Sequence, residues 1–155
     1  MKTTIAALFL SVCLTSAGQA QTSPRCFGNG DVTSPDGNFS AKVMRSGRST
    51  CGESKVEIYS GDGHLLTIAD YTSSDGTSGE GVIKAEWSPD SRYLVFSLSQ
   101  PQSGKPGPYT IAIFSTQKNK VKTLPVSKPD FVFNAGALEL AGGDGQPVRL
   151  PLNNP

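Results

Sequence analysis

Side chains able to do chemistry are few in this sequence, and its one histidine is the first to consider. His64 follows the turn Gly61-Asp62-Gly63. A histidine that acts as general base needs a nucleophile and an orienting carboxylate beside it. The sequence holds no Gly-x-Ser-x-Gly elbow that would present a serine. We therefore interpret His64 as an exposed turn residue.

Aspartates could supply the carboxylate pair of a glycosidase, because such a pair is formed in space and is invisible in sequence. Each candidate stands beside Gly or Pro, a setting typical of turns: Asp36, Asp62, Asp75, Asp90 and Asp144. Turn chemistry accounts for all five, so no catalytic residue is predicted. A glycan-directed hydrolase remains the third function that we consider.

Metal and phosphate sites also find little support. Asp75 and Glu80 could offer oxygen ligands to calcium, but their spacing is not that of a twelve-residue EF-hand loop. The glycine run from Gly76 to Gly81 opens no helix and carries a glutamate that would repel phosphate. We expect no metal and no cofactor.

The first 20 residues have the pattern of a cleaved signal peptide. Lys2 precedes a short apolar run, and Gly18-Gln19-Ala20 has the small-x-small form of a cleavage site. Cleavage leaves residues 21–155, enough for one domain, with 13 basic and 13 acidic residues. This balance gives no reason to expect nucleic acid or an anionic membrane as partner. The sequence thus predicts an exported, periplasmic protein that does not insert into the membrane.

Two cysteines remain after cleavage, Cys26 and Cys51. An even number of cysteines in an exported protein predicts a disulfide. A redox pair would favour Cys-x-x-Cys spacing, and a zinc site needs more ligands than one histidine adds.

The elements that position these candidate residues are predicted to be strands. Period-two or β-branched runs are the signature of strands, and they occur at 39–44, 56–59, 65–69, 82–87, 93–98, 110–114, 120–124, 131–133, 138–140 and 148–152. Gly and Pro interrupt the chain at hairpin spacing. No amphipathic helical pattern follows the signal segment, so the predicted class is all-β.

Two connections are longer than a hairpin requires. The first, residues 71–81, is polar and rich in glycine, and we interpret it as a flexible linker rather than a site. The second, residues 99–108, contains three prolines, which favour a held shape. Because long loops on a sheet scaffold often carry function, both a binding role and a purely connecting role remain open for the second loop.

One short phrase occurs twice, and it supports a family resemblance. Trp87-Ser88-Pro89-Asp90 with Tyr93 to Phe96 resembles the W-S-P-D-G-x-x-L-A-F signature of the WD40-like repeat in TolB-type β-propellers. Ser34-Pro35-Asp36-Gly37 with Phe39 to Ala41 is similar but lacks the tryptophan. The resemblance implies two blades, at about 29–70 and 82–124, and structural turns at Pro35, Asp36, Pro89 and Asp90. A C-terminal hairpin at about 131–152 would add a partial third sheet.

Two blades are too few for a ring, because a closed propeller needs about four. The chain would then be either a half-propeller that self-associates or an open stack of sheets with room to hold a partner. Small size, export and a truncated repeat resemble the periplasmic immunity proteins that neutralise cell-wall-degrading toxins of type VI secretion. The resemblance implies a loop inserted into the active site of the toxin.

We therefore expect a non-catalytic binding protein, monomeric or dimeric, that inhibits a periplasmic toxin or cell-wall hydrolase. The predicted contact residues belong to the second long connection: Ser99, Gln100, Gln102, Ser103, Gly104, Lys105 and Tyr109. An envelope scaffold that oligomerises through its open blades is the main alternative.

Overall fold

The computed structural model describes residues 26–47, 51–99, 108–142 and 146–152, and within them the chain is all-β without a helix. These ranges therefore contain no helix long and apolar enough to cross a bilayer. The expected signal segment, residues 1–20, lies outside them. The strands are β1 (Gly30–Thr33), β2 (Phe39–Ser46), β3 (Glu53–Ser60), β4 (Leu65–Asp70), β5 (Gly81–Trp87), β6 (Tyr93–Ser99), β7 (Tyr109–Ser115), β8 (Lys120–Val126), β9 (Phe131–Asn134), β10 (Ala137–Ala141) and β11 (Pro147–Pro151).

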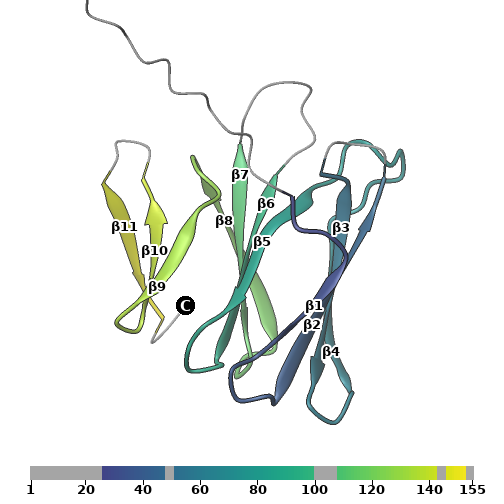
Figure 1. Cartoon of the computed structure of the whole chain (residues 1–155). Helices are drawn as coiled ribbons and strands as arrows, with labels where there is room; N and C mark the ends of the chain where they lie inside the picture. Colours follow the sequence, from purple (N-terminus) through teal and green to yellow (C-terminus); the bar gives the residue numbers. More distant parts are fainter. Residues whose placement is uncertain (1–25, 48–50, 100–107, 143–145, 153–155) are drawn as a thin grey trace, which may run out of the picture.

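The strands form three antiparallel sheets that lie side by side in chain order (Figure 1). Sheet A has the order β1-β2-β3-β4, sheet B the order β5-β6-β7-β8, and sheet C the order β11-β10-β9. The predicted class, all-β with two antiparallel units and a partial third sheet in an open arrangement, is confirmed, and both units are four-stranded. The last unit is a three-stranded sheet and not a hairpin, because β9 and β11 both pair with β10.

Sheet B is the middle layer of the stack, and its central strand is buried on both faces. In β6, every residue from Tyr93 to Leu98 is buried. A strand covered on both sides needs apolar residues at almost every position, not only at alternate ones. This explains the nearly continuous apolar runs of β6 and β7.

The core between sheets A and B is built from the facing sides of both sheets. Val56 and Ile58 of β3 belong to the same buried cluster as Phe96 and Phe114 of sheet B. Trp87 lies among them with its ring centroid 6.5 Å from that of Phe114, edge to face. Its indole Nε1–H donates to the Val32 carbonyl at 2.9 Å, which satisfies the one polar group of the ring.

A second core joins sheets B and C. Tyr93 and Val95 on the far side of β6 pack in one cluster with Phe131 and Leu138 of sheet C. The Tyr93 hydroxyl donates to the Leu152 carbonyl. The Lys84 ammonium donates to the Phe131 carbonyl at 2.7 Å and lies 4.2 Å from the centroid of that residue's ring. The C-terminal sheet is thus held by apolar packing and by polar contacts that reach across the layer.

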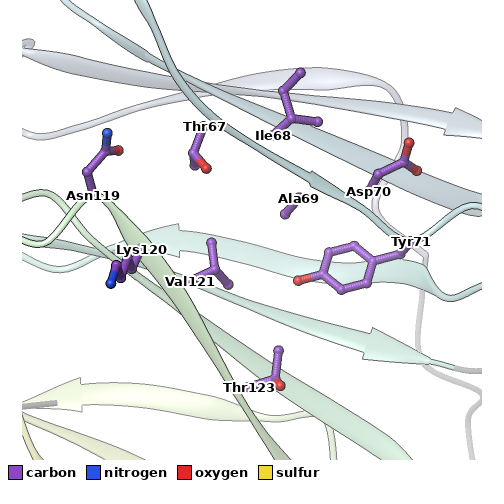
Figure 2. Close-up of a pocket in the computed structure, with 9 residues that line it drawn as sticks. All are labelled: Thr67, Ile68, Ala69, Asp70, Tyr71, Asn119, Lys120, Val121 and Thr123. Carbon is purple, nitrogen blue, oxygen red and sulfur yellow. The ribbon is translucent and has the colours of Figure 1, made fainter.

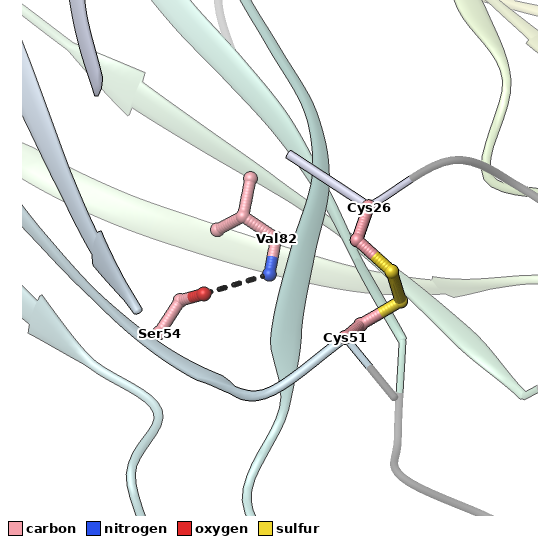
Figure 3. The surroundings of a disulfide bond; sticks show 4 residues. All are labelled: Cys26, Cys51, Ser54 and Val82. Carbon is pink, nitrogen blue, oxygen red and sulfur yellow. Dashed lines mark hydrogen bonds between the residues drawn. A yellow bond between two sulfur atoms is a disulfide. The ribbon is translucent and has the colours of Figure 1, made fainter. Parts of the chain in front are cut away.

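The disulfide expected from the cysteine count is present between Cys26 and Cys51, whose Cα atoms are 5.2 Å apart. It lies where sheets A and B meet, beside the start of β5 (Figure 3). There the Val82 N–H donates to Ser54 Oγ at 3.0 Å, and the Val82 carbonyl accepts from the Phe27 N–H at 3.0 Å. The covalent bond therefore fixes an end of the stack that is also tied by hydrogen bonds.

The outer faces of the stack carry charged residues, beside the exposed aliphatic side chains of Ile68 and Val132. On sheet A, the residues that alternate with the core positions of β2 and β3 include Lys42, Lys55 and Glu57, and the Lys55 ammonium lies 3.0 Å from a Glu57 carboxylate oxygen. On sheet C, Glu139 lies across from Arg149, with an ion pair of 3.9 Å. Such faces are stable against water without a further sheet to cover them.

Candidate functional site

A groove of about 440 Å³ runs between β4 and β8, the outer edge strands of sheets A and B (Figure 2). We call it the β4–β8 groove. It is lined by Thr67, Ile68, Ala69, Asp70, Tyr71, Asn119, Lys120, Val121 and Thr123. Chain segments more than 40 positions apart thus form one concave surface. The sequence of neither segment alone would indicate it.

The β4 wall takes its character from the alternation of the strand. Ala69 belongs to the core between sheets A and B, so Thr67, two positions earlier, faces the same side. The intervening Ile68 stands on the opposite side, where 48 % of its surface is exposed. The wall is therefore small and weakly polar inside the groove, with an aliphatic side chain at its outer rim.

Tyr71 forms the end of this wall. Its ring meets the ring of Phe96 edge to face, with the centroids 5.9 Å apart. Burial, followed by the nearby Glu80 carboxylate, raises the pKa of Tyr71 to about 12, so the hydroxyl keeps its proton at neutral pH. Figure 2 shows this hydroxyl directed along the groove toward Val121. Among the described residues no hydrogen bond contributes to the pKa shift of this hydroxyl, so it can donate to a bound molecule.

The connection from Tyr71 to Glu80 is held in place by Glu53, a carboxylate of which only 1 % is exposed. Glu53 accepts hydrogen bonds from the Ser73 N–H at 2.8 Å, the Gly79 N–H at 2.7 Å and the Ser73 hydroxyl. These bonds, led by that of the Ser73 hydroxyl, lower the pKa of Glu53. The connection is therefore a fixed part of the fold and not the flexible linker that its composition predicts.

The β8 wall is tied to β4 at one end. Asn119, in a left-handed conformation with φ of 50°, donates from its side-chain amide to the Leu66 carbonyl at 3.2 Å. Val121 and Thr123 follow with their side chains toward sheet A, since Val121 packs on the core between sheets A and B. The groove therefore has one end bridged by Asn119 and the other bounded by Tyr71.

The polar side chains of the groove lining are engaged within the protein or stand apart from one another. The carboxylate of the lining, Asp70, accepts from the Thr72 N–H at 3.0 Å and the Thr72 hydroxyl at 2.7 Å, and these bonds lower its pKa. Nothing in the lining pairs a nucleophile with a base. Across all described residues there is also no group of three or more metal-ligating side chains of the His, Cys, Asp and Glu types.

The possible calcium ligands have other roles. Asp75 accepts from the Thr77 and Ser78 N–H groups at 2.8 and 2.9 Å, as in an Asx turn, and its pKa is lowered, chiefly by the hydroxyls of Ser73 and Ser78. Glu80 accepts from the Thr110 hydroxyl at 3.1 Å. Both side chains already have partners within the protein.

The predicted contact loop falls mainly outside the described residues. This applies to Gln100, Gln102, Ser103, Gly104 and Lys105. Its two ends are described, because Ser99 closes β6, Tyr109 opens β7, and these two residues pair across the ladder. Tyr109 is only 6 % exposed, so its side chain is not an accessible contact as it stands.

The two Ser-Pro-Asp turns have the same hydrogen bonds. In the first, Asp36 accepts from the Ser34 hydroxyl at 2.6 Å, and Ser34 Oγ accepts from the Phe39 N–H at 2.9 Å. In the second, Asp90 accepts from the Ser88 hydroxyl at 2.6 Å, and Ser88 Oγ accepts from the Tyr93 N–H at 3.0 Å. Pro35 and Pro89 each occupy the position between these Ser and Asp residues. Asp36 also accepts from the Asn38 N–H at 3.0 Å and Asp90 from the Arg92 N–H at 3.2 Å, so both carboxylates bind the backbone of their own hairpins.

His64 lies in the exposed turn between β3 and β4, with its Nε2 atom 3.5 Å from an Asp62 carboxylate oxygen. Both side chains are largely open to solvent. Neither residue belongs to the groove lining, although the turn leads directly into β4.

No motif in the sequence marks the groove, so it is not among the sites predicted from the sequence. The signals present were the apolar Leu65 and Ile68 in a run that lacks Lys and Pro, and Tyr71 beside a long connection. Only the stacking of sheets A and B brings β8 alongside them. A comparison of the chain with protein-family models, curated proteins and solved structures found no match, so function must be argued from the geometry above.

Proposed function

We propose that this chain is an exported, non-catalytic binding protein that occludes the active site of a periplasmic enzyme, such as a toxin or cell-wall hydrolase. The Cys26–Cys51 disulfide supports export, because such bonds persist in oxidising compartments. Together with the expected signal peptide, it favours the periplasm. The partner class follows from the resemblance to small immunity proteins and rests on size, export and the truncated repeat.

The charged residues on the outer faces of the stack favour a binding protein over the scaffold alternative. A chain that assembles into a ring through its open sheets would need apolar residues on the faces that meet. Lys42, Lys55 and Glu57 on sheet A, with Glu139 and Arg149 on sheet C, would be desolvated by such contacts. We infer that the stack is complete as a monomer and that its partner is another protein.

The loop of residues 99–108 remains the proposed inserted element. Its ends are cross-strand neighbours on the rigid middle sheet, through the pairing of Ser99 with Tyr109. Its three prolines lower the entropy that the loop would lose on binding. The polar residues Gln100, Gln102, Ser103 and Lys105 would make the contacts.

The test uses the tagged mature chain, residues 21–155, as bait and as inhibitor. We expect one stoichiometric enzyme to be captured, and its activity to fall as mature protein is added. Replacing Ser103-Gly104-Lys105 with bulky residues should weaken this inhibition, whereas the same replacement at the Asp62-Gly63-His64 turn should not. A captured enzyme that keeps full activity would contradict the inhibitory role.

Sedimentation of the mature protein separates the two main functions. A monomer up to high micromolar concentration supports the partner-occluding binder, and a symmetric oligomer supports the scaffold. The glycan-directed hydrolase requires turnover that responds to substitution of His64 or of the turn aspartates.

A further inference from the structure

The exposed backbone of β4 points to the way in which a partner binds. The Tyr71 N–H donates to the Ser54 carbonyl of β3 at 3.0 Å. Backbone groups alternate in direction along an antiparallel strand. Asp70 and Ile68 therefore direct their N–H and C=O groups away from β3 and toward the β4–β8 groove, whose lining includes both residues.

The other sheet edges in the described chain each carry a feature that hinders strand pairing. In β5, both outward groups of Val82 are taken, by Ser54 and Phe27. In β8 and β11 the outward positions include Pro125, Pro147 and Pro151, which have no N–H. In β9 the Phe131 carbonyl accepts from Lys84, and β1 and β9 are only four residues long. Short strands, prolines and covered groups are the usual protection of an edge.

β4 has a bulge at Leu66, whose carbonyl is occupied by Asn119, so its regular edge consists of residues 67–70. This edge is no longer than β1 or β9, but it contains no Lys and no Pro. Leu65 and Ile68 expose 49 % and 48 % of their surface there. A sheet edge with exposed aliphatic side chains and without Lys or Pro can accept an additional strand.

We propose that β4 binds an extended segment of the partner protein as a fifth strand of sheet A, and that this segment carries a basic residue opposite Asp70. Its backbone pairs with Ile68 and Asp70. On one face its side chains fill the groove over Thr67, Ala69 and Tyr71, where the Tyr71 hydroxyl meets a polar atom. This inference rests on the proposed binding function and names the element of the partner that is recognised.

Charge decides between a partner strand and a second copy of this chain. Asp70 is the one charged residue of β4 and lies across the ladder from Lys55 of β3, and hydrogen bonds from Thr72, followed by the Lys55 charge, lower its pKa. Two copies paired through the same outward groups would set Asp70 opposite or diagonal to its own equivalent, or would set it against the bulge at Leu66. Like charges at such positions destabilise a ladder, whereas an opposite charge contributes up to about 1 kcal/mol. A partner strand with a basic residue opposite Asp70 therefore fits this edge better than a second copy of the chain does.

The experiment uses the mature protein and a set of labelled ten-residue peptides in which Thr and Val alternate. One position of each peptide is replaced in turn by Arg or by Glu. We expect the best Arg peptide to bind about threefold more tightly than its Glu counterpart in fluorescence anisotropy. Binding should slow hydrogen exchange at the amides of Ile68 and Asp70.

Two substitutions test the edge directly. Ile68→Pro removes an outward N–H without touching the ladder to β3, and it should weaken binding about tenfold. Arg149→Pro, which removes an outward N–H from β11, is the matched control and should leave binding unchanged. Asp70→Lys should reverse the preference, so that Glu peptides bind more tightly, and it gives an answer even if the proline variant does not fold.

Three results would overturn the proposal: no binding by either peptide set, binding that Ile68→Pro leaves unchanged, or protection of the Ile68 and Asp70 amides by self-association without peptide. These results are separable from the fate of the proposed function. An enzyme inhibited equally by wild type and by Ile68→Pro would retain the function and reject this strand-binding mode.

Discussion

The backbone N–H of Asp36 donates to the hydroxyl of Ser91 at 3.1 Å, so the two Ser-Pro-Asp turns touch each other across sheets A and B. The contact comes from the first position at which the two phrases differ. Gly37 has φ of 73° in the first turn, and Ser91 occupies the equivalent place in the second with φ of 59°. Ser91 therefore adopts a left-handed backbone conformation, and its hydroxyl accepts a hydrogen bond that joins sheets A and B.

Substitutions at Ser91 can separate these two effects. Ser91→Ala keeps the left-handed strain and loses the bond, and we expect it to lower the free energy of unfolding by about 1 kcal/mol. Ser91→Gly also loses the bond but relieves the strain, so it should be more stable than the alanine variant by about 1 kcal/mol. Urea denaturation measures both. Equal stability of the two variants would show that the positive φ costs nothing here.

Glu53→Gln should lower the thermal midpoint at neutral pH by roughly 5–10 °C, because the amide accepts the Ser73 and Gly79 bonds less well than the carboxylate. The folded pKa of Glu53 is lowered from its ordinary value of 4.5. Its contribution is therefore complete above pH 4.5 and is lost as the pH falls through the folded pKa. The difference in thermal midpoint between wild type and Glu53→Gln should therefore narrow as the pH falls through the folded pKa of Glu53. Glu86→Gln, at a largely exposed carboxylate paired with Lys84, is the control and should change the midpoint little at any pH.

Removing the disulfide should destabilise the protein by about 3 kcal/mol, the loop-closure value for the separation of 25 residues. The double substitution of Cys26 and Cys51 to serine, followed by guanidinium denaturation, measures it. A reducing agent should destabilise the wild type by a similar amount and leave the double variant unaffected. A wild type indifferent to reduction would contradict a stabilising role for the bond.

Ser97→Ala should be neutral or stabilising by up to about 1 kcal/mol. Ser97 is fully buried in β6, and its hydroxyl has no hydrogen-bond partner among the described residues. Replacing it removes a desolvated polar group and opens almost no cavity. Ser54→Ala is the contrast, because Ser54 Oγ accepts from the Val82 N–H, and it should cost about 1–2 kcal/mol.

The sequence predicted most strands because their patterns are local. All ten predicted runs lie within or overlap observed strands. The missed strand, β1, is four residues long and contains Gly30 and Asp31, which have low strand propensity, and it is held by pairing with β2. Its place depends on a partner strand and not on its own residues.

The third sheet shows the other limit. Its turn between β9 and β10 is formed by Ala135 and Gly136 with φ of 44° and 73°, and the Ser-Pro-Asp phrase is absent from it. The number of Ser-Pro-Asp phrases therefore predicts two full sheets and leaves the third sheet as a hairpin. The β4–β8 groove was unpredictable for a related reason, because it arises from the stacking of separate units. Asn119 and Leu66 touch only after both have folded.

The position of sheet C at the end of the chain has a consequence for synthesis. Until that sheet folds, sheet B presents an uncovered apolar face that includes Val95, Ile111 and Ile113. A chain that stops before β9 should therefore aggregate, although both repeats are intact. By covering this face, the C-terminal sheet should keep the protein soluble. We therefore expect the chain to resist self-association only after it has been synthesised to its end.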